Sequence, residues 1–261
     1  MNKCTILSTV LGGLVAAGCG GSGISGTPAQ NGKAVELTAA CARRAPGVGA
    51  VALAPPRAGS SVALARLGDR TLAYVADADA GVVRTVDVGT QAELARTPLA
   101  GSPSQLLVAE DGRVLVAIRD KAAIAVLEPT ANPAVALENR CSVPTAAEPV
   151  ALAVTPDDRT VLVTSGWGAA LSGFSAETMT PAFRVALARE PRAVVVSDDG
   201  KKAYVSHVVG SRMSVVDLAE PGHPVRTIEL RGTEKGVFRR RGLMGSLLGV
   251  GDDDEIDRKV C

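Results

Sequence analysis

The sequence predicts an all-β protein, a β-propeller made of four-stranded antiparallel blades. A unit recurs along the chain, and each copy contains a strand that ends in a valine. The successive distances are 41, 47 and 42 residues by subtraction of the residue numbers, and the valines are Val75, Val116, Val163 and Val205. A period of about 40–50 residues is typical of propellers and solenoids.

Strand composition and turn length favour a propeller over a helix-covered sheet. Residues 150–154 (VALAV) and 193–196 (AVVV) are continuously apolar, which is typical of strands covered on both faces. Helix-covered parallel sheets share this pattern, but their crossovers need about a dozen or more residues. Short turns such as Asp199-Gly200 instead indicate antiparallel hairpins.

Charge and composition limit the functions that the chain can have. The 261 residues carry a formal net charge of +1, whereas a nucleic-acid binder needs a concentrated basic surface. We therefore expect no nucleic-acid partner. Aromatic residues make up only 2% of the chain, so the blades must pack through small and β-branched side chains.

Residues 1–18 are predicted to be a signal peptide that is not part of the fold. Lys3 precedes an uncharged apolar stretch, Thr5 to Ala17, which is shorter than the ~20 residues that span a bilayer. Small residues then lead to Cys19, an arrangement that resembles a bacterial lipoprotein signal. This resemblance implies that Cys19 is lipidated and becomes the first mature residue. The alternative is an ordinary secretory signal cut nearby, with no role for Cys19.

Residues 19–47 are predicted to be a lipid-anchored flexible tether, because residues 20–33 are rich in Gly and Ser. The expected location is extracytoplasmic, at the outer membrane or cell surface, with the membrane as a partner through the lipid. Three cysteines remain beyond the signal and Cys19, so at most one internal disulfide can form, and its pairing stays open. They are Cys41, Cys141 and Cys261.

Residues 48–232 are predicted to form the propeller blades. A proline opens three of the units, where its missing N–H is tolerated at the first residue of a strand; these are Pro103, Pro149 and Pro191. Asp87 and Asp217 follow strands, and short carboxylates there can accept hydrogen bonds from nearby backbone N–H groups. We therefore interpret the recurring aspartates as turn residues, not catalytic groups.

The best-preserved unit resembles a known repeat. Tyr204-Val205-Ser206-His207 followed by Ser214-Val215-Val216-Asp217 is similar to the YVTN-type bacterial β-propeller repeat, and Tyr74-Val75-Ala76-Asp77 is a second copy. The resemblance covers roughly residues 58–231. It implies a propeller in an extracytoplasmic or cell-surface protein, and it implies no particular reaction.

About four units are visible, whereas propellers have ~4–8 blades. Either four blades close on themselves, or the chain is the front part of a longer propeller, and we favour the second interpretation. Residues 233–261 read as an irregular charged tail, which could be an insertion before further blades.

Two residues are candidate contacts for a ligand or partner on the blade loops. Trp167, the only tryptophan, lies in Ser165-Gly166-Trp167-Gly168; exposed loop aromatics can anchor partners, and the alternative is a ring folded over its own blade. His207 follows a strand, and some cofactor-binding propellers use a channel-facing histidine. A structural histidine is the alternative, since His223 is the only other one.

No catalytic, cofactor-binding or metal-binding motif is recognisable, and no cofactor is expected. The sequence-based hypothesis is a lipid-anchored extracytoplasmic propeller that acts as a binding scaffold, without catalysis of its own. The alternative is part of a redox (haem-associated) or hydrolytic propeller enzyme, completed by downstream sequence or by a partner.

Overall fold

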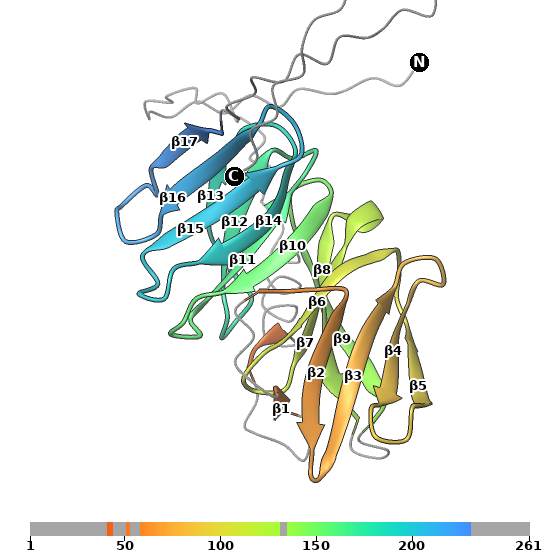
Figure 1. The fold of residues 1–261 in the computed structure, drawn as a ribbon. Coiled ribbons are helices and arrows are strands. Elements are labelled where there is room, and N and C mark those ends of the chain that lie inside the picture. Colours follow the sequence, from red (N-terminus) through yellow and green to blue (C-terminus); the bar gives the residue numbers. More distant parts are fainter. Residues whose placement is uncertain (1–40, 44–50, 53–57, 131–134, 231–261) are drawn as a thin grey trace, which may run out of the picture.

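The computed structural model describes residues 41–43, 51–52, 58–130 and 135–230. In this part of the chain the fold is all-β, with four antiparallel sheets in sequence order (Figure 1). Blade 1 contains β1 (Val51–Ala52), β2 (Val62–Leu67), β3 (Arg70–Asp77), β4 (Val82–Asp87) and β5 (Ala92–Pro98). Blade 2 contains β6 (Pro103–Val108), β7 (Val114–Ile118), β8 (Ala123–Pro129) and β9 (Leu137–Pro144), with a short 3-10 helix, η1 (Arg119–Lys121), between β7 and β8.

Blades 3 and 4 repeat the four-stranded pattern. Blade 3 contains β10 (Pro149–Val154), β11 (Thr160–Ser165), β12 (Ala170–Ser175) and β13 (Pro181–Ala186). Blade 4 contains β14 (Pro191–Val196), β15 (Lys202–His207), β16 (Arg212–Asp217) and β17 (Val225–Glu229). The predicted propeller of four-stranded antiparallel blades is thus confirmed, with the two-residue β1 as an additional edge strand of blade 1. The three unit-opening prolines are the first residues of β6, β10 and β14.

The recurring acids hold the turns, as the sequence predicts. Asp199 Oδ1 accepts a hydrogen bond from the Lys201 N–H at 3.0 Å, and Gly200 adopts the left-handed backbone that the turn requires, with φ of +72°. At a strand end, Asp217 Oδ1 accepts from the N–H groups of Ala219 and Glu220 at 3.0 and 3.1 Å. These carboxylates are therefore used by the backbone.

Each blade buries one face against the next. The cores between blades 1 and 2, 2 and 3, and 3 and 4 are separate clusters of mostly Val, Leu, Ile and Ala. In the first of these, Tyr74 is completely buried beside Leu106 and Val116. The apolar strands are covered on both faces only where a blade has two neighbours.

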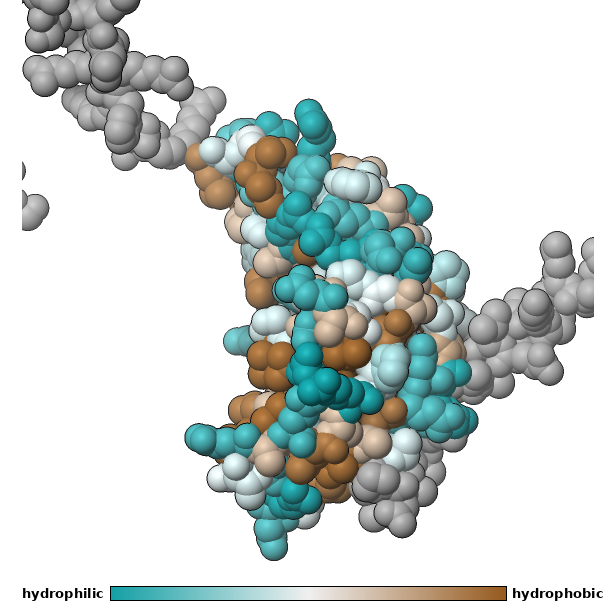
Figure 2. Space-filling model, turned by 90° about the vertical axis from the view of Figure 1, so that its right-hand side faces the viewer, coloured by the Kyte–Doolittle hydropathy of each residue, from teal (hydrophilic) through white to brown (hydrophobic). Residues whose placement is uncertain are grey.

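The four described blades do not close into a ring. Blades 1 and 4 lie at opposite ends of the arrangement in Figure 1. Blade 1 packs on blade 2, blade 2 on blade 3, and blade 3 on blade 4. Each end blade therefore has one face that no described blade covers. Figure 2, a view from the right-hand side of Figure 1, shows apolar side chains among polar ones at the height of blade 1.

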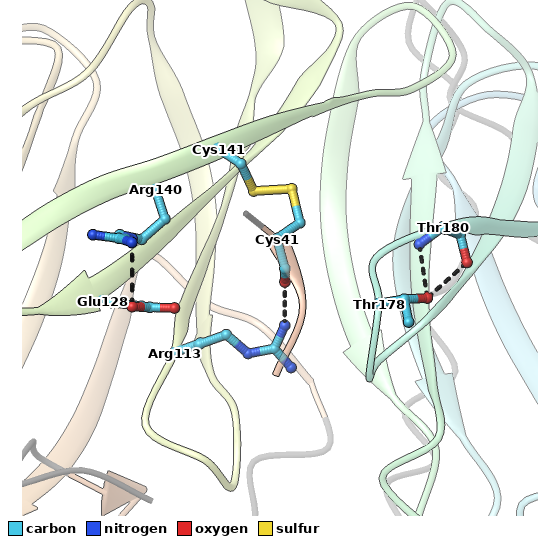
Figure 3. The surroundings of a disulfide bond; sticks show 7 residues. All are labelled: Cys41, Arg113, Glu128, Arg140, Cys141, Thr178 and Thr180. Atoms are coloured by element: carbon cyan, nitrogen blue, oxygen red, sulfur yellow. Dashed lines mark hydrogen bonds and ion pairs between the residues drawn. A yellow bond between two sulfur atoms is a disulfide. The ribbon is translucent and has the colours of Figure 1, made fainter. Parts of the chain in front are cut away.

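An N-terminal strap, Cys41–Arg43, ties blade 2 to blade 3. Cys41 forms a disulfide with Cys141 of β9, with their Cα atoms 5.5 Å apart (Figure 3). The buried Arg113 side chain donates to the Cys41 carbonyl at 2.9 Å and to the Ala176 carbonyl at 2.5 Å. The strap lies within residues 19–47, which the sequence assigns to the tether, and in the structure it packs against the blades.

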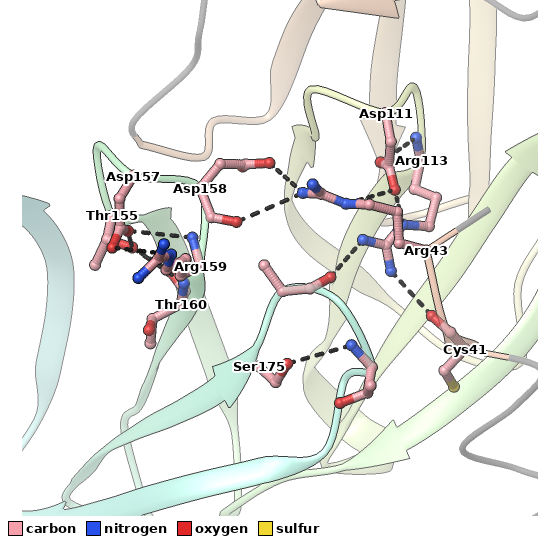
Figure 4. Close-up of polar contacts among 12 residues, drawn as sticks. Cys41, Arg43, Asp111, Arg113, Thr155, Asp157, Asp158, Arg159, Thr160 and Ser175 are labelled. Carbon is pink, nitrogen blue, oxygen red and sulfur yellow. Dashed lines mark hydrogen bonds and ion pairs between the residues drawn. The ribbon is translucent and has the colours of Figure 1, made fainter. Parts of the chain in front are cut away.

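Arg43, the last residue of the strap, contacts both blade 2 and blade 3. Its guanidinium contacts Asp111 in the β6–β7 turn at 3.4 Å and pairs with Asp158 in the β10–β11 turn (Figure 4). Further along, residues 58–60 pass beside the first strands of blades 3 and 2, where Gly59 N–H donates to Leu152 O at 2.7 Å and Ser60 N–H to Leu106 O at 3.0 Å. The two segments preceding β2 therefore bridge blades that come later in the chain.

Breaking the disulfide should destabilise the protein. The bond closes a loop with a sequence separation of 100 residues, and native disulfides typically contribute about 2–5 kcal/mol. We expect Cys41→Ser to lower the free energy of unfolding by about that amount, measured by chemical denaturation. A reductant should lower the stability of the native protein and leave that of the variant unchanged; equal sensitivity of both would contradict the prediction.

Tyr74→Phe should leave the stability unchanged or raise it. The Tyr74 hydroxyl is buried without a hydrogen-bond partner, and burial raises the pKa of the phenol to about 12. An unsatisfied buried polar group costs about 1–3 kcal/mol, so removing it while keeping the ring should raise the free energy of unfolding by up to that amount. Tyr74→Ala is the matched control and should lose about 3–5 kcal/mol by leaving a cavity.

Candidate functional site

A tightly held loop presents Trp167 at one end of blade 3. The loop joins β11 to β12, and its backbone bonds to the segment that precedes β10. Gly166 N–H donates to the Glu148 carbonyl at 2.8 Å, and Gly168 N–H to the Ala147 carbonyl at 2.9 Å. Trp167 N–H donates to Glu148 Oε2 at 3.1 Å. Three consecutive N–H groups are thus fixed by one short segment.

The two glycines beside Trp167 are required by close packing. A Cβ atom at Gly166 would lie 2.3 Å from Glu148 Oε2, and one at Gly168 would lie 2.7 Å from Ala146 Cβ. With the backbone held against this segment, the Trp167 side chain projects outward and is 78% exposed. The sequence left open whether the Trp167 ring is exposed on its loop or folded over its own blade, and in the structure it is exposed.

Glu148 is the buried acid on which this loop rests. Its carboxylate pairs with Arg119, the first residue of η1, and lies 3.5 Å from the Arg192 guanidinium in β14. The Glu148 side chain is only 7% exposed. Burial raises the pKa of Glu148, but the two arginines and the Trp167 N–H together outweigh it and hold the pKa below the usual value. Glu148 therefore joins blades 2, 3 and 4 as a carboxylate.

The network continues onto blade 4. Arg192 also pairs with Glu190 at 3.2 Å, and the Glu190 carbonyl accepts from the Val208 N–H at 3.1 Å. Val208 and Val209, in the loop after β15, are both exposed. We call the exposed and half-buried groups in and next to this network the Trp167 surface; it comprises Arg119, Trp167, Arg192, Val208 and Val209.

His207 lies beside this network, and hydrogen bonds account for both of its ring nitrogens. Nδ1 lies 2.9 Å from the Arg189 carbonyl oxygen, and Nε2 lies 2.8 Å from the hydroxyl of Ser214, a completely buried residue. The imidazole thereby links β15 to β16 and to the connection from blade 3. Its geometry is that of a structural histidine.

Of the remaining polar groups, Asp77 is used in a turn, and two cysteines lie outside the described residues. Asp77 accepts from the Ala80 N–H at 2.9 Å and pairs with Arg84, which makes the segment from Asp77 to Gly81 a turn. Among the described residues, no group of three or more His, Cys, Asp or Glu is arranged to hold a metal ion. Cys19 and Cys261 lie outside the described residues.

A cleft of about 610 Å³ lies between blades 3 and 4 at the end opposite Trp167. Asp157 and Asp199 line it, and each accepts a hydrogen bond from a backbone N–H in its own turn. His223 in the same cleft stacks against Phe183 with ring centroids 3.8 Å apart. These polar groups already have partners, so the Trp167 surface is the stronger candidate.

The sequence analysis did not identify Glu148, Arg119 and Arg192. A signal for part of the network was available, because Glu148 and Glu190 occupy the same repeat position, directly before a strand-opening proline. The arginines offered no comparable signal. Their pairing depends on how neighbouring blades are placed, and that placement is not a local property of the sequence.

No protein-family model matches the chain, and no curated protein matches it. Among solved structures, hydrazine synthase from Kuenenia stuttgartiensis aligns at 19% identity over 60% of this chain and 46% of that chain, with a TM-score of 0.50. A Lactobacillus plantarum protein aligns at 16% identity over 62% and 55%, with a TM-score of 0.53. A candidate 6-phosphogluconolactonase from Bacteroides fragilis aligns at 15% identity over 65% and 56%, also with a TM-score of 0.53.

These likenesses show the fold alone, because every identity is below 20%. The chain spans about half the length of the structures that it matches. Among the described residues, no helix is long and apolar enough to cross a membrane. The comparisons thus support the β-propeller architecture and leave the site to be interpreted from its own geometry.

Glu148→Gln should lower the stability at neutral pH. A carboxyl whose folded-state pKa is depressed contributes stability above its usual pKa, and this contribution is lost as the pH falls through the lower folded-state value. Hydrogen bonds to charged groups contribute about 1.5–3 kcal/mol, so we expect a loss of that size at pH 7. The difference between native protein and variant should shrink below pH 4.5, the usual glutamate value; a difference independent of pH would contradict the ion-pair assignment.

Proposed function

We propose that the protein is a lipid-anchored, extracytoplasmic β-propeller that binds a protein partner through the Trp167 surface. The observation that carries this proposal is an apolar ring, 78% exposed, on a loop whose backbone is fixed by hydrogen bonds to Glu148 and Ala147. Tryptophan and arginine are enriched among the residues that contribute most to protein–protein binding. Here both residue types are presented together on a rigid support, so little conformational entropy is lost on binding.

The exposure of the Trp167 ring supports the assignment. An exposed ring contributes little to folding, whereas the two glycines and the buried Glu148 are all used to hold its backbone in place. Arg119 and Arg192 share the Glu148 carboxylate, and Arg192 also pairs with Glu190, so two arginines are balanced by two carboxylates at this point. The Arg119 side chain is 46% exposed, so a partner that offers an apolar side chain and a hydrogen-bond acceptor would match this surface.

Two observations support the extracytoplasmic location. The sequence has the lipoprotein-like arrangement that ends in Cys19, and the structure contains the Cys41–Cys141 disulfide. Structural disulfides persist mainly in oxidising compartments. The regular repeat of four units supports the relationship to YVTN-type propellers, which remains part of the proposal.

No observation on the described residues favours the enzyme alternative. His207 has hydrogen-bond partners at both ring nitrogens, and the recurring aspartates serve the turns. The binding module is therefore the function that the geometry supports best.

Trp167→Ala should weaken partner binding strongly without affecting stability. A photoreactive amino acid at position 167, introduced in the native host, should give a discrete crosslinked product with one protein. The same probe at Val88, an exposed residue in the β4–β5 turn of blade 1, should give no such product. With the purified partner, Trp167→Ala should raise the Kd about 30-fold or more, while the thermal midpoint stays unchanged. Equal affinity of native protein and variant would refute the proposal.

The anchor can be tested separately. We expect Cys19→Ala to move the protein from the membrane fraction to the soluble extracytoplasmic fraction, because a lipidated Cys19 would be its attachment point. Fractionation followed by immunoblotting measures this. Membrane association that survives the substitution would remove the anchor from the proposal and leave the Trp167 surface untouched.

A further inference from the structure

Each end blade has an apolar face that no described blade covers. On blade 1 this face includes Val62 and Leu64, each 44% exposed, and we call it the blade-1 open face. On blade 4 it includes Val195, which is 51% exposed, and the neighbouring Tyr204; we call it the blade-4 open face. Exposed apolar faces of this kind mark interaction surfaces.

The strand register shows that the blade-1 open face corresponds to a face that is buried in blades 2, 3 and 4. Val62 pairs with Val75 across β2 and β3, as Leu106 pairs with Val116 across β6 and β7. Leu106 is completely buried against blade 1. The corresponding residues of blades 3 and 4, Leu152 and Val194, are also buried against the preceding blade. The blade-1 open face is thus the face by which a blade docks on its predecessor.

The blade-4 open face is the opposite half of that contact. Tyr204 occupies the same repeat position as Tyr74, since each directly precedes the valine that marks the unit. Tyr74 is completely buried between blades 1 and 2. Val195, which pairs with Tyr204, corresponds to Leu107, which is buried between blades 2 and 3. The blade-4 open face is therefore the face on which a following blade docks.

We propose that two copies of this chain associate head to tail, with blade 4 of each copy packed on blade 1 of the other. The two open faces are the two halves of a contact already formed three times within the chain, and they lie at opposite ends of the arrangement in Figure 1. A head-to-tail contact closes into a ring when the rotation permits. Two arcs of four blades make eight, within the usual range of propellers.

The size of known propeller-like structures agrees with this arrangement. The chain covers 46%, 55% and 56% of three structures that it resembles, so its aligned part corresponds to about half of each of those chains. A second copy supplies the missing half and both missing contacts at once. The proposed dimer does not depend on partner binding at the Trp167 surface, because the two open faces share no residue with that surface.

The test is the mass of the full chain in solution, measured by light scattering and sedimentation. A dimer of twice 26.5 kDa is expected. Val195→Arg and Leu64→Arg should each weaken dimerisation about 100-fold or more, because each places an unpaired charge in the contact. Val88→Arg, at an exposed position in the turn between β4 and β5, is the control and should remain dimeric.

Mixing the two disruptive variants distinguishes head-to-tail pairing from other dimers. In a mixed dimer one contact carries both substitutions and the other is native, so dimers should reappear in the equimolar mixture. A symmetric pairing of two blade-4 faces would leave Leu64→Arg dimeric and give no such recovery. A monomeric native chain, in which residues 231–261 or further blades cover the open faces, would overturn the proposal, as would an open-ended polymer.

Discussion

The burial of blade faces against one another is the constraint on which the rest of the structure depends. The strands are apolar on both sides, and with so few aromatic residues the contacts are made by Val, Leu, Ile and Ala. Such a sheet is stable only when both faces are covered. The three contacts between neighbouring blades cover the faces inside the arrangement. Within the described blades, one face of blade 1 and one face of blade 4 remain uncovered.

Polar interactions then fix how the packed blades sit relative to one another. Glu148 draws together blades 2, 3 and 4 at the Trp167 end, and Arg113 joins the strap to blades 2 and 3 at the other end. Both are buried ionic groups with several partners, which is the condition under which a buried charge is tolerated. The exposed tryptophan rests on one of these two connections, so its position is as rigid as the contact between blades.

Much of the fold could be predicted from the sequence, because it depends on local signals. The period between the marker valines, the prolines at the start of strands and the turn aspartates are all visible within a few residues. The site could be predicted only in part: Trp167 was identifiable as a lone loop aromatic, but its exposure depends on Glu148 and on the clash that a side chain at Gly166 would cause. Likewise the partner of Cys41 could not be chosen from spacing, since it depends on how the chain returns to the first strand of blade 1.

The strap has a consequence for the order in which the protein assembles. Cys41 meets a partner 100 residues later in the chain, and Arg43 contacts Asp158 and Glu177, which come later still. Blades 2 and 3 must therefore exist before the segment that precedes blade 1 can find its place. Contacts of such large sequence separation form slowly, because a long loop must first be closed. During synthesis from the N-terminus onward, the first described residues of the chain are thus among the last to become fixed.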